Sequence, residues 1–268
     1  MPETPSCRIR IGVGGWSYAP WRGVFYPKGL PQGKELEYAS RKLTSIEIDS
    51  TYYGSKNPET FRRWRDETPD DFVFSVKGPR FATNRRVLRE AGPSIERFFK
   101  SGVTELKHKL GPVNWQFATT KRFDPADFGD FLELLPVSVD GLAIRHAVEV
   151  RNMSFRTGEF VDLMRARGVA VVTAGDSKFP LIADLTAPFV YARIMGTGEA
   201  EEKGYGEAAL GLWAERTMAW AAGAAPPGLE LIDPTAKASP RDVFLYLIGG
   251  FKERNPLAAM ALIERAGA

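Results

Sequence analysis

The sequence predicts a single-domain TIM-type (β/α)8 barrel, because strand and helix patterns alternate along the whole chain. Eight segments have strand character, and most are short apolar runs rich in Val, Ile, Phe and Tyr that end in Gly, Ser, Asp or Pro. Strands that are too apolar for a sheet with one wet face indicate parallel βαβ units. Eight such units in about 250 residues match a closed barrel. We therefore expect one domain over residues 1–268.

The expected elements follow one another with short connections. The expected strands are residues 8–14, 45–51, 72–77, 113–118, 142–151, 169–174, 189–195 and 243–248. The segments between them that fit a 3.6-residue period are 35–43, 58–67, 94–110, 124–135, 158–167, 207–222 and 255–265. Asn57-Pro58 and Asp124-Pro125 are helix start signals, in which a capping side chain precedes a proline.

An open, doubly wound sheet is the alternative to the closed barrel. In that fold the first strand leads into a glycine-rich phosphate loop and then a helix. Here the first strand leads into Gly14-Gly15-Trp16, which lacks that pattern. The sequence therefore favours the barrel, in which functional sites lie at the carboxyl ends of the strands.

The composition of the chain gives limited information about its binding partners and its cellular compartment. Its 36 Lys and Arg against 33 Asp and Glu give a net charge of +3, which does not argue for a nucleic-acid partner. The single cysteine, Cys7, excludes an internal disulfide and fits a reducing compartment. No segment approaches the ~20 apolar residues of a membrane span, and residues 1–10 lack the apolar region of a secretory signal. We expect a soluble cytoplasmic protein without a membrane partner, and its oligomeric state is left open.

The second expected strand carries two carboxylates on one face. Because its residues alternate, Ile46 and Ile48 share one face and Glu47 and Asp49 share the other. In a barrel the aliphatic face packs against the helices, so Glu47 and Asp49 are expected to point into the barrel. Acids held inside a protein must be paired or serve a function.

The same alternation places other polar side chains inside the barrel mouth. Those expected to point inward are Lys77, Gln116, Glu149, Arg151 and Arg193, while Asp176 closely follows the sixth strand. All of them lie in the C-terminal half of a strand or just beyond it, where the sites of such barrels are built. Isolated charges there would cost several kcal/mol each, so four acids against three bases indicate an interlocked network.

Two interpretations of this network are open. It can close the barrel mouth with salt bridges alone, or it can form a polar ligand site, which we favour because burying many charges is a poor source of stability. Trp16 and Tyr18, which follow the first strand, are either an aromatic wall for a sugar or base or lids over the barrel end. The glycine-rich segment 196–206 is expected to be a mobile flap.

No cofactor is indicated by the sequence. With only two histidines and no clustered cysteines, the chain does not supply a multi-histidine metal centre, and an all-carboxylate Mg²⁺ site is not indicated. We expect His108 to lie at the surface and His146 to be structural. The arginines between residues 80 and 89 can bind phosphate or form a solvated helix face.

Six stretches of the sequence together carry a family resemblance. They are I-G-V-G-G-W-S-Y (11–18), W-R-G-V-F-Y-P (21–27), I-E-I-D-S-T-Y-Y (46–53), F-V-F-S-V-K-G-P (72–79), L-G-P-V-N-W-Q-F (110–117) and V-E-V-R (148–151). In these stretches the chain resembles the YecE-like family, also called domain of unknown function 72. The resemblance runs over nearly the whole chain and implies a TIM-type barrel. A nucleic-acid-related role for that family rests on fold analogy with endonucleases.

The resemblance also implies which residues form the barrel mouth. The recurrent mouth residues that it carries over are Glu47, Lys77, Gln116, Glu149 and Arg151. The chain departs from the family pattern at Asp49, where Asn is usual, and at Asn84, where Thr-His is typical. In addition, L-I-G-G-F (247–251) replaces an ending rich in Asn and Asp. These departures remove amide groups and a histidine from the expected site.

The leading hypothesis is a metal-independent enzyme that acts on a polar substrate, anionic or polyhydroxyl, at the C-terminal barrel mouth. Glu47 and Glu149 are the candidate general acid and base. Lys77, Arg151 and Arg193 are expected to hold the negative charge of the ligand. Strands two and five are expected to lie across the barrel from each other, so that the two carboxylates address opposite sides of a ligand.

The alternative hypothesis is a non-catalytic binding protein. It would hold a nucleic-acid segment or a small metabolite against Trp16, Tyr18 and the arginines between residues 80 and 89. Under either hypothesis, Asp49, Gln116 and Asp176 are further candidates for ligand binding.

Overall fold

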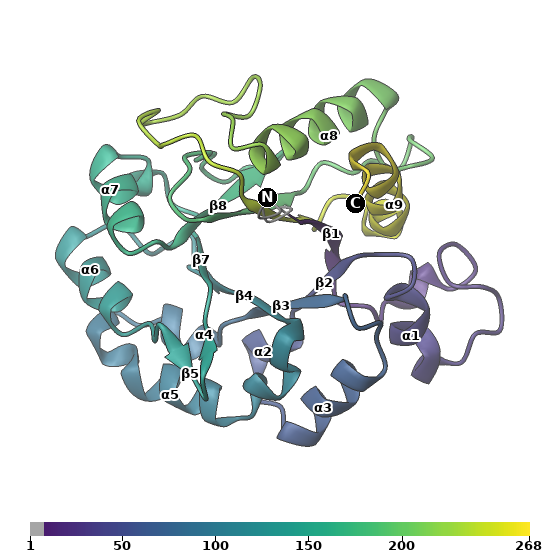
Figure 1. The fold of residues 1–268 in the computed structure, drawn as a ribbon, viewed down its shortest axis with the longest axis horizontal. Helices are drawn as coiled ribbons and strands as arrows, with labels where there is room; N and C mark the ends of the chain where they lie inside the picture. Colours follow the sequence, from purple (N-terminus) through teal and green to yellow (C-terminus); the bar gives the residue numbers. More distant parts are fainter. Residues whose placement is uncertain (1–7) are drawn as a thin grey trace, which may run out of the picture.

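Eight parallel strands close into a barrel, which confirms the predicted fold class; the computed structural model describes residues 8–268, so Cys7 lies outside the described residues. The barrel strands are β1 (Ile9–Gly14), β2 (Ser45–Ile48), β3 (Val73–Lys77), β4 (Leu110–Gln116), β7 (His146–Glu149), β8 (Ala170–Gly175), β9 (Phe189–Ile194) and β10 (Asp242–Leu247). They are hydrogen-bonded around the barrel in the order β1-β10-β9-β8-β7-β4-β3-β2. Figure 1 shows this ring with the helices outside it.

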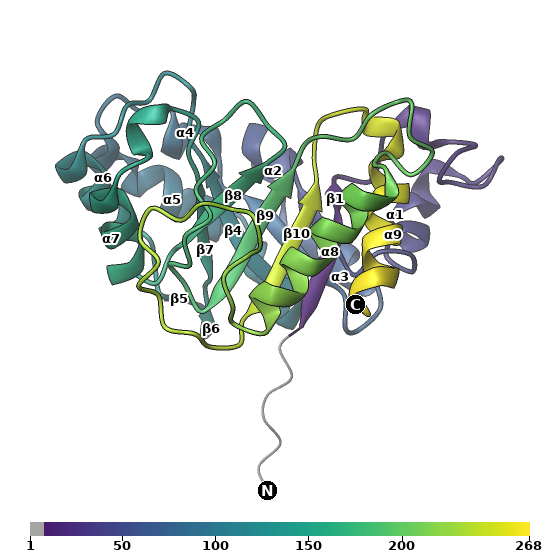
Figure 2. The same cartoon turned by 90° about the horizontal axis from the view of Figure 1, so that it is seen from above.

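The helices cover the outer face of the barrel. They are α1 (Glu35–Ala39), α2 (Ser50–Tyr53), α3 (Pro58–Asp66), α4 (Arg80–Thr83), α5 (Gly92–Lys100), α6 (Pro125–Glu133), α7 (Gly158–Ala166), α8 (Glu207–Ala221) and α9 (Asn255–Ala266). The short helices α2 and α4 lie at one end of the barrel in Figure 2. Within residues 8–268, none of the helices combines the length and the apolar character that crossing a bilayer requires.

Both predicted helix start signals are confirmed. The Asn57 side chain accepts a hydrogen bond from the backbone N–H of Thr60 at 2.9 Å, at the start of α3. The Asp124 carboxylate accepts two such bonds, each at 3.1 Å, at the start of α6. In both helices a proline follows the cap, where its missing N–H costs no hydrogen bond.

The helix predicted over residues 94–110 ends earlier than its periodicity indicates. Helix α5 stops at Lys100, and Gly102 follows with a φ of 97°, which the right-handed helix does not allow. Residues 103–109 then form a 3₁₀ segment, interrupted at Lys107, which has a φ of 55°. Strand β4 begins at Leu110, three residues before its predicted start, because the helix has already ended.

The strand predicted over residues 142–151 is divided in two. Its first residues belong to a small antiparallel hairpin made of β5 (Ser138–Val139) and β6 (Leu142–Ala143). Asp140 and Gly141 form the turn of this hairpin, with φ values of 50° and 76°. The hairpin lies at the end of the barrel opposite to α2 and α4, and only β7 enters the barrel sheet.

The alternation of side chains in the strands follows the predicted pattern. Ile46, Ile48 and Val76 are buried in the large apolar core between the strands and the helices. Inward-facing residues of β7 to β10 form a second apolar cluster deep in the barrel, which includes Tyr191 and Tyr246. The polar residues described below lie above this cluster, at the carboxyl ends of the strands.

Candidate functional site

A single arginine joins two carboxylates inside the barrel mouth. Arg193 on β9 places Nη2 3.0 Å from Oε1 of Glu47 on β2, and its Nη1 donates to Oε2 of Glu149 on β7. All three side chains are buried, with exposures of 0–1%. Arg151 adds a second cation, because its Nε donates to Oε1 of Glu149 at 2.7 Å. The sequence-predicted charges therefore meet in one network.

The expectation that the strands of Glu47 and Glu149 lie directly across the barrel from each other is wrong. Strands β2 and β7 are separated by β3 and β4 along one side of the barrel, so they are not directly opposite. Both carboxylates bind the same guanidinium group, because the long Arg193 side chain reaches both from β9. The space between the two carboxylates is filled by an arginine of the protein.

Two members of the network were not identified from the sequence. The Tyr191 hydroxyl donates to Oε2 of Glu47, and Asn114 Nδ2 donates to the same oxygen at 3.1 Å. Tyr191 also lies 2.8 Å from the Ser75 hydroxyl. Strand alternation indicates that both residues point inward, since Asn114 lies on the same strand face as Gln116 and Tyr191 lies on the same face as Arg193. Both residues lie one layer deeper in the barrel than the strand ends, where sites in this fold are expected.

The buried charges of this network are held in their ionised forms. Burial acts to raise the pKa of Glu47, but neighbouring cations, Arg193 foremost, outweigh it and hold that pKa below its usual value. The pKa of Glu149 is lowered in the same way: burial is outweighed by Arg193 and Arg151. Burial disfavours charge on Arg193, yet the two glutamates raise the pKa of its guanidinium. Both glutamates therefore remain carboxylates at neutral pH.

Lys77 and Asp49 form a separate pair at the edge of the network. Lys77 Nζ donates to Gln116 Oε1 at 2.7 Å and lies 3.6 Å from Asp49 Oδ1. It also lies 4.6 Å from the ring centroid of Tyr52. Burial and then the charge of Glu47 raise the pKa of Asp49, while burial and then Arg193 lower the pKa of Lys77. This acid and this base are therefore both shifted toward their neutral forms.

A pocket of about 390 Å³ opens beside this pair. Asp49 lines the pocket together with Trp16, Tyr18, Tyr53 and Lys252. The Asp49 side chain is 34% exposed, whereas the Lys77 side chain is 8% exposed and does not line the pocket. Trp16 packs edge-on against Trp64 in the protein body, with ring centroids 5.1 Å apart, so that it forms a fixed wall. The pocket is therefore charged at Asp49 and Lys252 and aromatic at Trp16, Tyr18 and Tyr53.

Asp49 keeps its position because Gly14 on β1 has no side chain. A Cβ at Gly14 would lie 2.8 Å from Asp49 Oδ2 and 2.8 Å from Ile248 Cδ1. Real Cβ atoms essentially never approach other atoms this closely. The glycine at this position therefore allows the carboxylate to lie against the strand.

Asp176 is not brought into the network. It follows β8 at the same end of the barrel, but its Oδ2 accepts hydrogen bonds from Tyr205 Oη at 2.9 Å and from Trp213 Nε1 at 2.8 Å. Its φ of 50° turns the chain away from the strand direction, so the inward alternation stops before it. Asp176 therefore holds the 196–206 segment and α8 in place.

The 196–206 segment is hydrogen-bonded at several points. The backbone N–H of Gly196 donates to Tyr205 Oη at 2.8 Å, and Gly198 donates to the carbonyl of Gly204 at 2.7 Å. Thr197 Oγ1 donates to Asn255 Oδ1 at 2.7 Å, and the Thr197 carbonyl accepts from the backbone of residue 251. The segment expected to be a flap is thus tied both to itself and to the loop after β10.

The two histidines lie outside the network. Trp115 Nε1 lies 3.0 Å from His146 Nδ1, and His146 Nε2 lies 2.8 Å from the Pro136 carbonyl. Burial lowers the pKa of His146 to about 4. His108 Nε2 lies 3.1 Å from the Asp70 carbonyl. Among residues 8–268, no three His, Cys, Asp or Glu side chains are grouped closely enough to hold a metal ion.

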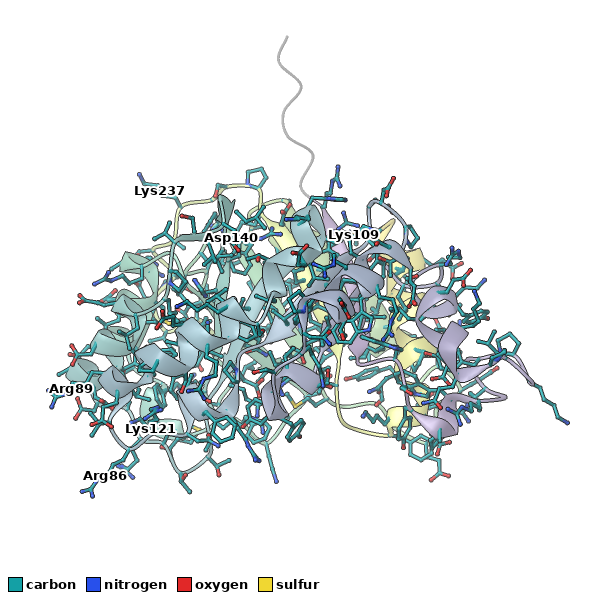
Figure 3. All side chains as sticks on the ribbon, turned by 90° about the horizontal axis from the view of Figure 1, so that it is seen from below. Arg86, Arg89, Lys109, Lys121, Asp140 and Lys237 are labelled. Atoms are coloured by element: carbon teal, nitrogen blue, oxygen red, sulfur yellow. The ribbon has the colours of Figure 1, made fainter. Side chains whose placement is uncertain are left out.

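The arginines between residues 80 and 89 have different partners. Arg80 lies beside two exposed rings, with its guanidinium carbon 6.0 Å from the centroid of Tyr53 and 5.3 Å from that of Phe81. Arg85 instead donates to the Phe81 carbonyl at 3.0 Å. In Figure 3 the Arg86 label lies near that of Lys121, at the edge of the molecule away from Lys109, Asp140 and Lys237. Arg80 adjoins a residue of the pocket, Tyr53.

Two relatives match part of the chain. The UPF0759 protein YecE of Escherichia coli K12 is 29% identical over 142 residues, which is 52% of this chain and 48% of that protein. The UPF0759 protein YunF of Bacillus subtilis 168 is 29% identical over 114 residues, which is 41% of this chain and 39% of that protein. The chain thus spans about half the length of these relatives, or less.

Solved structures match the fold over nearly the whole chain. A DUF72 family protein from Thermotoga maritima has a TM-score of 0.75 at 20% identity, covering 97% of this chain and 100% of that one. A DUF72 family protein from Enterococcus faecalis has a TM-score of 0.70 at 16% identity, covering 97% and 96%. At such identities the likeness shows the fold alone. The family model described as "Protein of unknown function DUF72" matches residues 10–268, and the chain therefore belongs to the DUF72 family.

Proposed function

We propose that this chain is a metal-independent enzyme, and that its polar substrate, anionic or polyhydroxyl, binds in the pocket beside Asp49. The observation that carries the proposal is the Lys77–Asp49 pair. Asp49 lines the pocket, Lys77 Nζ lies 3.6 Å from Asp49 Oδ1, and neither side chain is hydrogen-bonded to Arg193. Perturbed titratable groups of this kind beside a concave pocket are the usual mark of a catalytic site.

In this proposal the buried network is a fixed electrostatic frame. Glu47 and Glu149 are fully buried, bound to Arg193 and held ionised, so neither is suited to exchange protons with a ligand. Proton transfer then belongs to Asp49, whose raised pKa is nearer to the operating range of a general acid or base. Arg193 holds Glu47 and Glu149 in place. Its guanidinium group is already bound by these two carboxylates and is therefore not assigned to the ligand.

The walls of the pocket support a small polar substrate. Trp16 and Tyr18 offer aromatic faces on which the apolar side of a sugar can pack. Lys252 lines the same pocket, with its Nζ 4.8 Å from the ring centroid of Tyr18, and can pair with an anionic group. The volume of about 390 Å³ lies within the range of small-molecule sites. Arg151 is a second candidate for ligand charge, since its side chain is 22% exposed.

A ligand screen followed by matched variants tests this proposal. Sugars, sugar acids and sugar phosphates would be screened by tryptophan fluorescence, and hits would be followed for turnover by NMR. Asp49→Asn should reduce turnover about 100-fold or more while leaving affinity largely intact. Glu199→Gln, at an exposed glutamate on the same end of the barrel, should change neither. A parent protein that binds a hit without turning it over, or an Asp49→Asn variant that retains full turnover, would contradict the proposal.

Non-catalytic binding of single-stranded nucleic acid is the second candidate. It is favoured by Arg80, which lies beside the rings of Tyr53 and Phe81 with exposures of 66% and 58%. Exposed rings next to a cation can stack bases and bind phosphates. If so, oligonucleotide affinity should fall steadily as salt rises and should drop further in Arg80→Ala. Affinity that is insensitive to salt would rule this candidate out.

A further inference from the structure

Lys77 is a buried lysine without a carboxylate hydrogen-bond partner. Its Nζ donates to the neutral amide oxygen of Gln116 at 2.7 Å, and the nearest carboxylate oxygen, on Asp49, is 3.6 Å away. The carboxylates of Glu47 and Glu149 are instead bound by arginines. A neutral amine that donates one hydrogen to Gln116 keeps its lone pair free for attack on an electrophile.

The surrounding charges allow Lys77 to be neutral. Glu47 and Glu149 carry two negative charges, and Arg151 and Arg193 carry two positive charges, so this frame is balanced without Lys77. If Lys77 gives its proton to Asp49, the charge of the site does not change. Burial lowers the pKa of Lys77 and raises that of Asp49, so both groups are shifted in the direction of this neutral pair.

We infer that Lys77 forms an imine with the carbonyl group of an open-chain hydroxyaldehyde or hydroxyketone held in the Asp49 pocket. This inference rests on the proposed function and names its substrate class. Lys77 Nζ lies 3.6 Å from Oδ1 of Asp49, the acid that lines the pocket. Its side chain is only 8% exposed, so the slender end of an open-chain substrate fits this approach better than a closed ring.

The proposed step balances in atoms and charge. The Nζ lone pair forms a C–N bond to the carbonyl carbon, and the carbonyl oxygen takes the proton of the Asp49 carboxyl group. The new ammonium group returns one proton to Asp49, which passes it to the hydroxyl group as that group leaves as water. The products are a protonated imine on Lys77, one water molecule and the Asp49 carboxylate, which is the charge partner of the cation. Neither an oxidant nor a reductant is required.

Reductive trapping tests the inference on the full chain. The protein would be incubated with dihydroxyacetone or glycolaldehyde and sodium cyanoborohydride at pH 7.5, and the adducts would be mapped by peptide mass spectrometry. Lys77 should be modified faster than the exposed Lys28 and Lys178, because each unit by which a lysine pKa falls gives about tenfold more neutral amine. Asp49→Asn should slow labelling of Lys77 about tenfold or more and leave labelling of Lys28 unchanged.

The control variants separate chemistry from folding. Lys77→Arg should abolish the adduct at residue 77, whereas Lys28→Arg should abolish only the adduct at residue 28. If Lys77→Arg fails to fold, the ratio of labelling rates at Lys77 and Lys28 in the parent protein still decides the question. Labelling of Lys77 no faster than that of Lys28, in protein shown to be folded by circular dichroism, overturns the inference.

The failure of the imine and the failure of the proposed function have different signatures. Absence of a Lys77 adduct, together with loss of turnover in Asp49→Asn, would leave an enzyme that does not use an imine. Absence of turnover on any bound ligand, with Lys77 labelled no faster than exposed lysines, would contradict both the imine and the proposed function. The trapping readout does not depend on knowledge of the natural substrate.

Discussion

Arg193 and Glu47 form a buried ion pair across the inside of the barrel, with Nη2 and Oε1 3.0 Å apart. The two residues are 146 positions apart in the sequence and come from β9 and β2, which are not neighbours in the sheet. Glu149 binds the other side of the same guanidinium. The stability and the chemistry of the barrel mouth both depend on this arginine.

Removal of Arg193 should destabilise the protein strongly. Arg193→Met would leave two buried carboxylates without their shared cation, and breaking a buried ion pair in this way typically costs about 3–5 kcal/mol. The free energy of unfolding in urea would measure the loss. Arg167→Met is the matched control, because its ion pair with Glu133 is exposed and should contribute no more than about 1 kcal/mol. Equal effects of the two variants would contradict the central role of Arg193.

Removal of the Tyr191 hydroxyl should disturb Glu47 without opening a large cavity. In Tyr191→Phe, Glu47 loses a buried donor and the Ser75 hydroxyl loses its contact, which should cost about 1–3 kcal/mol of stability. The pKa of Glu47 should rise, since a hydrogen bond to the carboxylate is removed. Denaturant unfolding and carboxylate NMR titration would measure these changes. Tyr53→Phe, at an exposed ring, should leave both unchanged.

Substitution of Gly14 should displace Asp49. The Cβ of Gly14→Ala would lie 2.8 Å from Asp49 Oδ2, so the carboxylate must move and its separation from Lys77 must change. Both close atoms, Asp49 Oδ2 and Ile248 Cδ1, are the ends of flexible side chains, so they can shift at little cost in stability. The rate at which Lys77 is trapped by a carbonyl compound should fall. Gly33→Ala, where a new Cβ meets no atom within 4 Å, should preserve both stability and trapping rate. An unchanged trapping rate in Gly14→Ala would contradict the assigned role of Asp49.

Acid should weaken the fold through the two buried glutamates. Burial opposes their ionisation, but the neighbouring cations outweigh it, so their pKa values are lower in the folded protein than in the unfolded chain. At pH values between the folded and the unfolded pKa, the unfolded chain binds more protons than the folded protein does. The folded protein therefore loses stability as the pH falls through this range. We expect the free energy of unfolding to decrease below about pH 5. Glu149→Gln should show a shallower decrease, and Glu199→Gln should match the parent protein. A slope unchanged in Glu149→Gln would count against this account.

The closed barrel and the inward polar residues could be predicted because both follow from simple periodicity. Alternation with a period of two placed Glu47, Lys77 and Arg193 inside the barrel without knowledge of their neighbours. Alternation ends where the strand ends, and Asp176, one residue beyond β8, therefore turned toward Tyr205 instead of the network. Periodicity also did not reveal that Lys107 adopts a positive φ after the end of α5.

Pairing within the site could not be predicted from strand positions alone. Which carboxylate meets which cation depends on the length of each side chain and on the stagger of the strands. Arg193 is long enough to reach both Glu47 and Glu149, so Lys77 was left with Gln116 and the more distant Asp49. The division into a fixed frame and a titratable pair became visible only from these distances.

The bridge made by Arg193 also bears on how the barrel assembles. If β9 slipped by one residue against its neighbours, Arg193 would turn toward the apolar helices and Ala192 or Ile194 would face the two carboxylates. Two uncompensated negative charges would then lie inside the barrel, and a cation would be buried among aliphatic side chains. Such misaligned forms are therefore much less stable than the native barrel. The same side chain that organises the mouth thus specifies the alignment in which the last strands close the ring.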